Sequence, residues 1–164
     1  MYITPKNQKN LYGYSDQFNE MLNIFKNNNF PNKVIFSGKK GIGKSTFAYH
    51  LVNYIFSQNE ENKYDILNNK INEINKSFLL IQNKVHPNFY LVNLKDKKKD
   101  IDIAQIREMI QFTYKSSFNN SFKIILIDDA EYLNQSSTNA LLKIIEEPND
   151  NVLFFLIYDN SKKI

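Results

Sequence analysis

A glycine-rich segment near residue 40 constrains this chain most, because it has the spacing of a phosphate-binding loop. Residues 38–45 read Gly-Lys-Lys-Gly-Ile-Gly-Lys-Ser, which fits the pattern G-x-x-x-x-G-K-[ST]. The apolar segment 33–37 before it suits a buried strand, and the apolar residues after it recur at helical spacing. A strand, a glycine turn and a helix start gather backbone N–H groups and the positive end of a helix dipole around one point. The segment therefore predicts a polyphosphate site.

The residues of this loop have expected roles in binding a magnesium–nucleotide complex. Lys44 would reach the β- and γ-phosphates, and the Ser45 hydroxyl would be a ligand of Mg²⁺. A glycine-rich turn with a chance lysine is the alternative, but it leaves both flanking patterns unexplained. The residues expected to contact the nucleotide are Gly38, Lys39, Lys40, Gly41, Ile42, Gly43, Lys44, Ser45 and Thr46.

A second motif ends a run of apolar residues with two acids. Residues 122–127 are rich in isoleucine and are followed by Asp128 and Asp129. This arrangement is typical of a Walker B strand, whose carboxyl end delivers an acid to the metal, so Asp128 is the candidate ligand of Mg²⁺, directly or through a water. Taken alone, the run could equally be a strand leaving the core for solvent. With the phosphate loop upstream, the two motifs predict one site in which Lys44 and Asp128 face the same triphosphate.

The composition sets further limits. A chain of 164 residues with 42% hydrophobic residues suits one domain over residues 1–164 with a substantial core. No segment is long and apolar enough to span a membrane, and the amino terminus lacks a signal pattern. Because the chain has no cysteine, disulfides and thiolate metal sites are excluded, and a reducing cytosol is compatible with this composition.

The net charge of +4 is weak grounds for nucleic-acid binding. Arg107 is the only arginine, and the abundant lysine, asparagine, isoleucine and tyrosine are what an A+T-rich genome would produce. The lysines of segment 95–99 are expected in a solvated loop. Charge alone therefore selects no partner.

Alternating patterns along the chain predict a parallel α/β sheet covered on both faces. An extended arm is expected over residues 1–14. One strand lies between the two motif strands in sequence, which leaves room for an additional strand between them in the sheet. Helices are predicted over 15–26, 44–57 and 64–82. A fourth helix is predicted to begin at an N-cap, Asp102, with Ile103, Ile106, Ile110 and Tyr114 on one face. A fifth is predicted over 136–147, with Leu141, Leu142 and Ile145 inward. Strands are predicted over 33–37, 89–94, 122–127 and 151–157.

Several blocks of the chain together resemble AAA+ clamp-loader subunits, and most closely the delta-prime subunits of bacterial DNA polymerase III. The most specific block runs from Ile127-Asp128-Asp129-Ala130-Glu131 to the Asn-Ala-Leu-Leu-Lys and Glu-Glu-Pro of residues 139–148. The further blocks that match this family are Asn-Leu-Tyr-Gly-Tyr at 10–14, the phosphate loop at 37–48, His-Pro-Asn at 86–88 and the segment 101–107.

The resemblance implies a three-layer α/β/α P-loop NTPase fold of the AAA+ type, with a mainly parallel sheet. It implies that the chain stops before the last strand, the helical lid and the carboxy-terminal collar. It also implies ATP and Mg²⁺ as cofactors, no zinc module, and an arm segment beside the adenine. The implied role is to help load the sliding clamp onto primed DNA, within a hetero-pentamer of loader subunits in the bacterial cytoplasm.

The chain departs from the family pattern at the expected catalytic acid. Hydrolysing AAA+ proteins usually carry Glu after the Walker B Asp, whereas this chain has Asp129, one methylene shorter. A misplacement of about 1 Å can cost about 10²-fold in rate, so ATP binding with weak or absent hydrolysis is expected. Glu131 is not expected to substitute, and Asn160 rather than Asp159 is the expected polar sensor near the γ-phosphate. A hydrolysing gamma/tau-type loader ATPase is the main alternative, and another P-loop ATPase or kinase is a weaker one.

Overall fold

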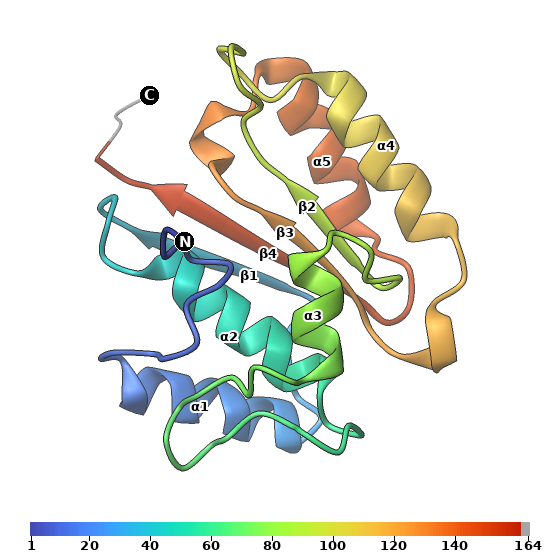
Figure 1. Ribbon diagram of the computed structural model, residues 1–164. Coiled ribbons are helices and arrows are strands. Elements are labelled where there is room, and N and C mark those ends of the chain that lie inside the picture. Colours follow the sequence, from blue (N-terminus) through green and yellow to red (C-terminus); the bar gives the residue numbers. More distant parts are fainter. Residues whose placement is uncertain (162–164) are drawn as a thin grey trace. The chain divides into compact units, whose positions relative to one another are not determined.

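The computed structural model describes residues 1–161, which form two compact units (Figure 1). The first unit contains residues 1–31 and 43–86, and the second contains residues 32–42 and the described residues from Pro87 onward. The first holds three helices, and the second holds a four-stranded sheet with two helices. The expectation of one domain over residues 1–164 stays a prediction.

The sheet of the second unit consists of parallel strands throughout. Its order is β1 (Lys33–Gly38), β4 (Val152–Asp159), β3 (Lys123–Ile127) and β2 (Phe89–Val92), and every neighbouring pair is parallel. An additional strand lies between the two motif strands β1 and β3 in the sheet, and it is β4, whereas β2, which lies between them in sequence, is at the edge of the sheet. The parallel sheet with helices confirms the α/β class.

Both faces of the central strands are buried, which explains why the residues between Lys123 and Asp128 and those from Val152 to Ile157 are all apolar. All five residues of β3 are buried. On one face of the sheet, α4 (Ile103–Tyr114) and α5 (Gln135–Glu146) complete a common core. Residues of this core include Val92, Ile106, Met109, Ile125, Ile127, Leu141, Ile144 and Phe154. Their neighbours on the strands, such as Ile124, Leu126 and Phe155, are fully buried on the other face.

Side chains cap the N-termini of α4 and α5, which begin at or within one residue of their predicted starts. The Asp102 carboxylate accepts a hydrogen bond from the backbone N–H of Gln105 at 3.1 Å, which confirms the predicted N-cap of α4. Asn134 caps α5 in the same way, accepting from the N–H of Ser137 at 2.9 Å. Short 3₁₀ turns lie at Phe118–Asn120 and Ala130–Tyr132.

The inward faces of these two helices were partly mispredicted. Leu142 was expected inward but is 48% exposed, while Ile144 is buried. Tyr114 was expected on the inward face of α4 but is 70% exposed, and Met109 is fully buried there. Successive helical residues are rotated by about 100°, so an error of one position moves a side chain from core to solvent.

The first unit is built on α1 (Ser15–Lys26) and α2 (Lys44–Phe56), both close to their predicted bounds. All nine residues from Phe47 to Ile55 in α2 are buried. Phe18 of α1 packs edge-to-face on Phe47 with the ring centroids 5.3 Å apart. The third helix of this unit, α3, spans Lys76–Gln82.

The predicted helix over residues 64–82 is wrong, because only its last seven residues are helical. The segment before it is a loop rich in asparagine, whose side chains bond to nearby backbone and compete with helix formation. Asn72 accepts from the N–H of Ile74, and Asn75 caps α3 by accepting from the N–H of Phe78 at 2.8 Å. Of the expected apolar stripe, Ile71 is buried but Ile74 is 63% exposed.

A buried histidine joins this loop to α2 and to the amino-terminal arm. The two ring nitrogens of His50 lie 2.9 Å from the backbone oxygen of Gln8 and 2.8 Å from the hydroxyl of Tyr64. Because a carbonyl only accepts, Nε2 carries the proton and Nδ1 accepts from Tyr64. Burial lowers the pKa of His50 to about 4, against the opposing hydrogen bond to Gln8. The neutral imidazole therefore links three segments.

The stability of the chain should fall on acidification below about pH 6.5. The unfolded state takes up a proton at His50 near its ordinary pKa, whereas the folded state resists protonation down to about pH 4. At about 1.4 kcal/mol per pKa unit, complete acidification would cost roughly 3 kcal/mol. Burial also lowers the pKa of the only other histidine, His86, to about 4, so it acts in the same direction. Denaturant unfolding at pH 7, 5.5 and 4.5 measures the effect.

A His50→Gln variant is the matched control for this pH dependence, because glutamine keeps a donor but cannot titrate. We expect the free energy of unfolding to change less with pH between 6.5 and 4.5 than in the unsubstituted chain, with His86 supplying the remainder. An equal pH dependence in both proteins would contradict the assignment to His50.

Candidate nucleotide-binding site

The phosphate-loop segment takes backbone conformations that require glycine. Gly41 has φ +85° and Gly43 has φ +96°, where an added Cβ would be strained. Gly43 is the N-cap of α2, which begins at Lys44, and no side chain caps this helix end. An N-terminus without a side-chain cap suits an anion, since its backbone N–H groups and its dipole favour negative charge.

The expected site residues are divided between the two units. Gly43, Lys44, Ser45 and Thr46 belong to the first unit, in which the Tyr14 ring lies 3.9 Å from the position of a Cβ on Gly43. That Lys44 and Asp128 face one triphosphate stays a prediction. The expected residues of the second unit are Gly38, Lys39, Lys40, Gly41, Ile42, Asp128, Asp129 and Asn160.

Within the second unit, the carboxyl ends of β1, β3 and β4 lie at the same edge of the sheet (Figure 1). Gly38, the first residue of the phosphate loop, is in register with Asp159. The N–H of Asn160 donates to the backbone oxygen of Gly38 at 3.2 Å. Ligand sites of parallel sheets form at this edge, so the expected sensor residue lies directly beside the start of the phosphate loop.

The two acids after β3 are held by their own backbone. The N–H of Asp128 donates to the backbone oxygen of Val92 at 2.8 Å, which places Asp128 at the end of the strand. Its carboxylate accepts from the N–H of Asp129 at 3.0 Å. Asp129 has φ +60°, a left-handed conformation that Asp tolerates better than most residues. Both side chains are half-buried.

A family model described as DNA polymerase III, delta subunit, matches residues 13–164. The chain belongs to this family. The matched range includes the phosphate loop and the acids after β3, so the family covers both motifs found in the sequence. The expectation of a clamp-loader type of chain, made from sequence blocks, is confirmed at the level of the family.

Curated relatives carry two kinds of DNA polymerase III subunit name. Subunit delta' of Pseudomonas aeruginosa is 28% identical over 54% of this chain and 27% of its own length. Subunit gamma/tau of Mycoplasma genitalium is 28% identical over 98% of this chain and 25% of its own length. Subunit gamma of the Buchnera aphidicola strain from Acyrthosiphon pisum is 32% identical over 79% of this chain and 34% of its own length. The chain spans about a quarter of the delta' and gamma/tau relatives.

A solved structure supports the fold. A gamma subunit-related protein of DNA polymerase III from Thermotoga maritima superposes on 89% of this chain and 40% of its own, with a TM-score of 0.50 and 15% identity. At this identity the similarity concerns the fold alone, and it agrees with the parallel α/β sheet described above.

Glu131, to which the sequence analysis gave no role, makes a specific hydrogen bond. The Glu131 carboxylate, in the 3₁₀ turn after β3, accepts a hydrogen bond from the backbone N–H of Asp159 at 3.2 Å. Asp159 itself is buried, and its carboxylate accepts from the backbone N–H and the hydroxyl of Ser161 at 3.0 and 2.6 Å. Glu131 therefore has a backbone partner, and the expectation that it does not replace a catalytic Glu stays a prediction.

The two residues expected to hold Mg²⁺ carry oxygen donors, which suit this ion. Among residues 1–161, no group of three His, Cys, Asp or Glu side chains could hold a metal ion alone. A magnesium ion bound with nucleotide takes only one or two protein ligands, with phosphates and waters supplying the rest. The Ser45 hydroxyl and the Asp128 carboxylate are of this type.

No helix in the described part of the chain combines the length and hydrophobicity needed to cross a membrane.

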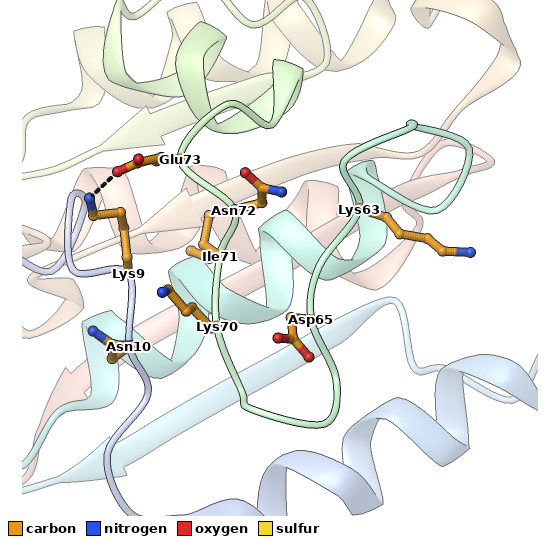
Figure 2. A pocket seen from close by; sticks show the side chains of 8 residues that line it. All are labelled: Lys9, Asn10, Lys63, Asp65, Lys70, Ile71, Asn72 and Glu73. Atoms are coloured by element: carbon orange, nitrogen blue, oxygen red, sulfur yellow. Dashed lines mark hydrogen bonds and ion pairs between the residues drawn. The ribbon is translucent and has the colours of Figure 1, made fainter.

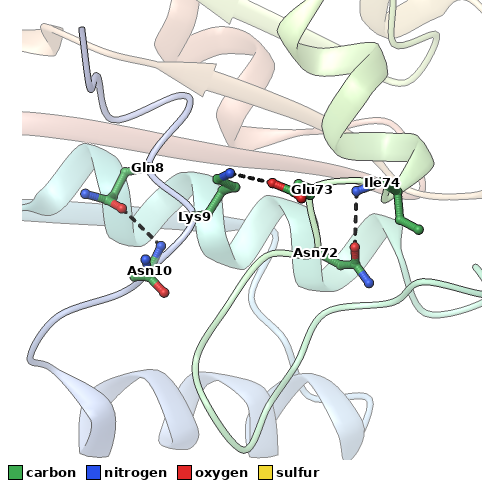
Figure 3. Close-up of polar contacts among 6 residues, drawn as sticks. All are labelled: Gln8, Lys9, Asn10, Asn72, Glu73 and Ile74. Carbon is green, nitrogen blue, oxygen red and sulfur yellow. Dashed lines mark hydrogen bonds and ion pairs between the residues drawn. The ribbon is translucent and has the colours of Figure 1, made fainter. Parts of the chain in front are cut away.

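The arm of the first unit is paired with the asparagine-rich loop. The N–H of Leu11 donates to the backbone oxygen of Asn69 and that of Ile71 to Lys9, at 3.0 and 2.9 Å. Lys9 also forms an ion pair with Glu73 at 2.7 Å, which Figure 3 shows beside the contact between Gln8 and the N–H of Asn10. Residues 9–11 of the arm are thus held against the loop.

A polar cavity of about 450 Å³ lies where the arm meets this loop (Figure 2). None of its lining residues belongs to the predicted nucleotide site. Of the lysines that line the cavity, Lys9 forms an ion pair with Glu73. The Asp65 carboxylate accepts hydrogen bonds from the backbone and side-chain N–H groups of Asn68. The residues that line it are Lys9, Asn10, Lys63, Asp65, Lys70, Ile71, Asn72 and Glu73.

Proposed function

We propose that this chain is the nucleotide-binding part of a delta-prime-like subunit of the DNA polymerase III clamp loader. It binds Mg·ATP and helps to place the sliding clamp on primed DNA, together with the other loader subunits of a hetero-pentamer in the bacterial cytoplasm. The observation that carries the proposal is the family match over residues 13–164. The matched range includes a phosphate loop followed by a helix N-terminus that no side chain caps.

The residues of the site divide the work of binding by their chemistry. Backbone N–H groups of the loop and the Lys44 ammonium bind phosphate oxygens, and Ser45 and Asp128 hold the magnesium ion. Asn160 supplies an amide beside the start of the loop, where it can distinguish a γ-phosphate from its absence. Nucleotide then acts mainly as a ligand that shifts the packing between subunits.

A hydrolysing loader ATPase of the gamma/tau type is the second candidate. The gamma/tau relative of Mycoplasma genitalium aligns with 98% of this chain, more than the delta' relative of Pseudomonas aeruginosa does. Asp129 argues against it, because a shorter acid in a left-handed backbone conformation does not reach an attacking water as Glu would. Another P-loop ATPase or kinase has only the fold in its favour.

Calorimetric titration with Mg·ATP, followed by a phosphate-release assay, tests the proposal. We expect saturable binding at one site and little phosphate release by the chain alone. The same assays on a loader reconstituted with its partner subunits and primed DNA test the assembly role. Absence of Mg·ATP binding would refute the nucleotide-binding part, and rapid phosphate release by this subunit would favour the gamma/tau type.

Asp129→Glu should raise ATP hydrolysis within a reconstituted loader. The added methylene moves the carboxylate outward by about 1 Å, toward an attacking water, and misplacement on this scale is worth about 10²-fold. The left-handed backbone at this position adds strain of about 1 kcal/mol, which lowers the gain without abolishing it. Phosphate release by the variant and by Asp129→Asn, which has no basic group, measures the effect. No gain over the unsubstituted chain would contradict the expectation.

A further inference from the structure

The carboxyl end of β4 extends beyond the end of β3, one of its two neighbours in the sheet. In the register of the sheet, the last residue of β3, Ile127, pairs with Leu156, so β4 continues for three more residues, to Asp159. Backbone N–H groups of a strand point alternately to its two neighbours. The N–H of Phe154 donates toward β1, to Asn32, and that of Asn160 likewise donates to Gly38. The N–H of Asp159 therefore points to the other side, where β3 has already ended.

The Glu131 side chain takes the place of the missing strand at this point. Its Oε2 accepts from the N–H of Asp159 at 3.2 Å. Two consecutive N–H groups are thus bound from opposite sides, that of Asp159 by a carboxylate and that of Asn160 by the backbone of the phosphate loop. A hydrogen bond to a charged acceptor is stronger than one between neutral groups. The extended backbone is fixed up to Asn160.

A general-base role for Glu131 fits the geometry less well. One carboxylate oxygen is engaged by a backbone N–H, and the residue lies in a 3₁₀ turn that begins after Asp129. A carboxylate beside bound phosphates is also electrostatically unfavourable, so phosphate contact does not suit this side chain.

We propose that Glu131 is a positioning residue that holds Asn160 against the phosphate loop and thereby sets the preference for ATP over ADP. The inference rests on the proposed nucleotide binding. The backbone N–H of Asn160 is bonded to Gly38, where the loop begins, so this residue lies at the edge where phosphates would bind. Loss of the Glu131 contact loosens the end of β4 on the side opposite β1, and it weakens only interactions that depend on this position. ADP, which lacks the γ-phosphate, should be affected less than ATP.

Three substitutions of Glu131 separate reach from charge. Glu131→Gln keeps the length and an acceptor oxygen without the charge, whereas Glu131→Asp keeps the charge but shortens the reach. Glu131→Ala removes both. Affinities for Mg·ATP and Mg·ADP are measured by calorimetry on the full chain. We expect the ATP-to-ADP affinity ratio to fall about fivefold in the Ala and Asp variants and to be mostly restored in the Gln variant. Should the Ala variant fail to fold, the Asp and Gln variants still decide.

A double-mutant cycle with Asn160→Ala provides the specific readout. If Glu131 acts through Asn160, Glu131→Asp should change the ratio little further once Asn160 is alanine. Equal losses of ATP and ADP affinity, additive effects, or an unchanged ratio in the Asp variant would each overturn the inference while leaving nucleotide binding intact. Absence of Mg·ATP binding in the unsubstituted chain would overturn the proposed function instead, and the inference with it.

Discussion

A chain that ends at Pro148 should show no cooperative thermal unfolding transition. The deletion removes β4, which pairs with both β1 and β3 and so joins the two motif strands. Burying one large apolar side chain contributes about 1.5–3 kcal/mol. Five residues of β4 are buried and apolar, so their loss approaches or exceeds the roughly 5–15 kcal/mol by which a native protein is stable. They are Val152, Leu153, Phe154, Phe155 and Ile157. Calorimetry or circular dichroism on heating measures the result.

Phe155→Ala is a milder form of the same test. Phe155 is fully buried and packs edge-to-face on Phe36 of β1, with the ring centroids 5.8 Å apart. Truncating a buried phenylalanine typically costs about 3–5 kcal/mol. Leu142→Ala on the exposed side of α5 is the control, and it should cost less than about 1 kcal/mol. A cooperative melt of the truncated chain, or equal losses in the two point variants, would contradict the central place of β4.

Lys44→Ala should lower the affinity for Mg·ATP by roughly 100-fold, equivalent to about 2.7 kcal/mol. The reason is the expected contact of its ammonium with two phosphate groups, since each hydrogen bond to a charged group contributes about 1.5–3 kcal/mol. Lys44 is half-buried at the first position of α2, so the substitution should leave the melting temperature nearly unchanged. Titration calorimetry measures the affinity.

Lys63→Ala is the matched control, because Lys63 is exposed and lines the separate polar cavity of the first unit. Its affinity for Mg·ATP should equal that of the unsubstituted chain. Unchanged ATP affinity in Lys44→Ala would remove the phosphate loop from the proposed function. A similar loss in both variants would point to general electrostatics rather than to a phosphate contact.

The sequence predicted elements with a clear period and failed where side chains compete with the backbone. Helix α1 has the predicted bounds, and α4 begins at the predicted N-cap. The prediction for segment 64–75 failed because its apolar spacing resembles a helix, whereas its asparagines hydrogen-bond to nearby backbone N–H and C=O groups in a loop. Side-chain directions were less certain than bounds, as the exposure of Leu142 shows.

The sequence likewise predicted one part of the candidate site and missed another. The glycines and acids of the two motifs could be found because each motif is local in sequence and has a fixed spacing. The contact between Glu131 and Asp159 joins residues 28 positions apart. It depends on how far β4 extends past β3, which is a property of sheet register that no local pattern encodes.

The order of the strands has a consequence for how this protein is made. Residue 33 at the start of β1 pairs with residue 154 near the end of the described chain. At about 5–20 residues per second, a ribosome needs on the order of ten seconds to synthesise the intervening segment. During that interval the apolar residues of β1 lack their central partner, so the nascent polypeptide is exposed to misassembly until β4 has been synthesised.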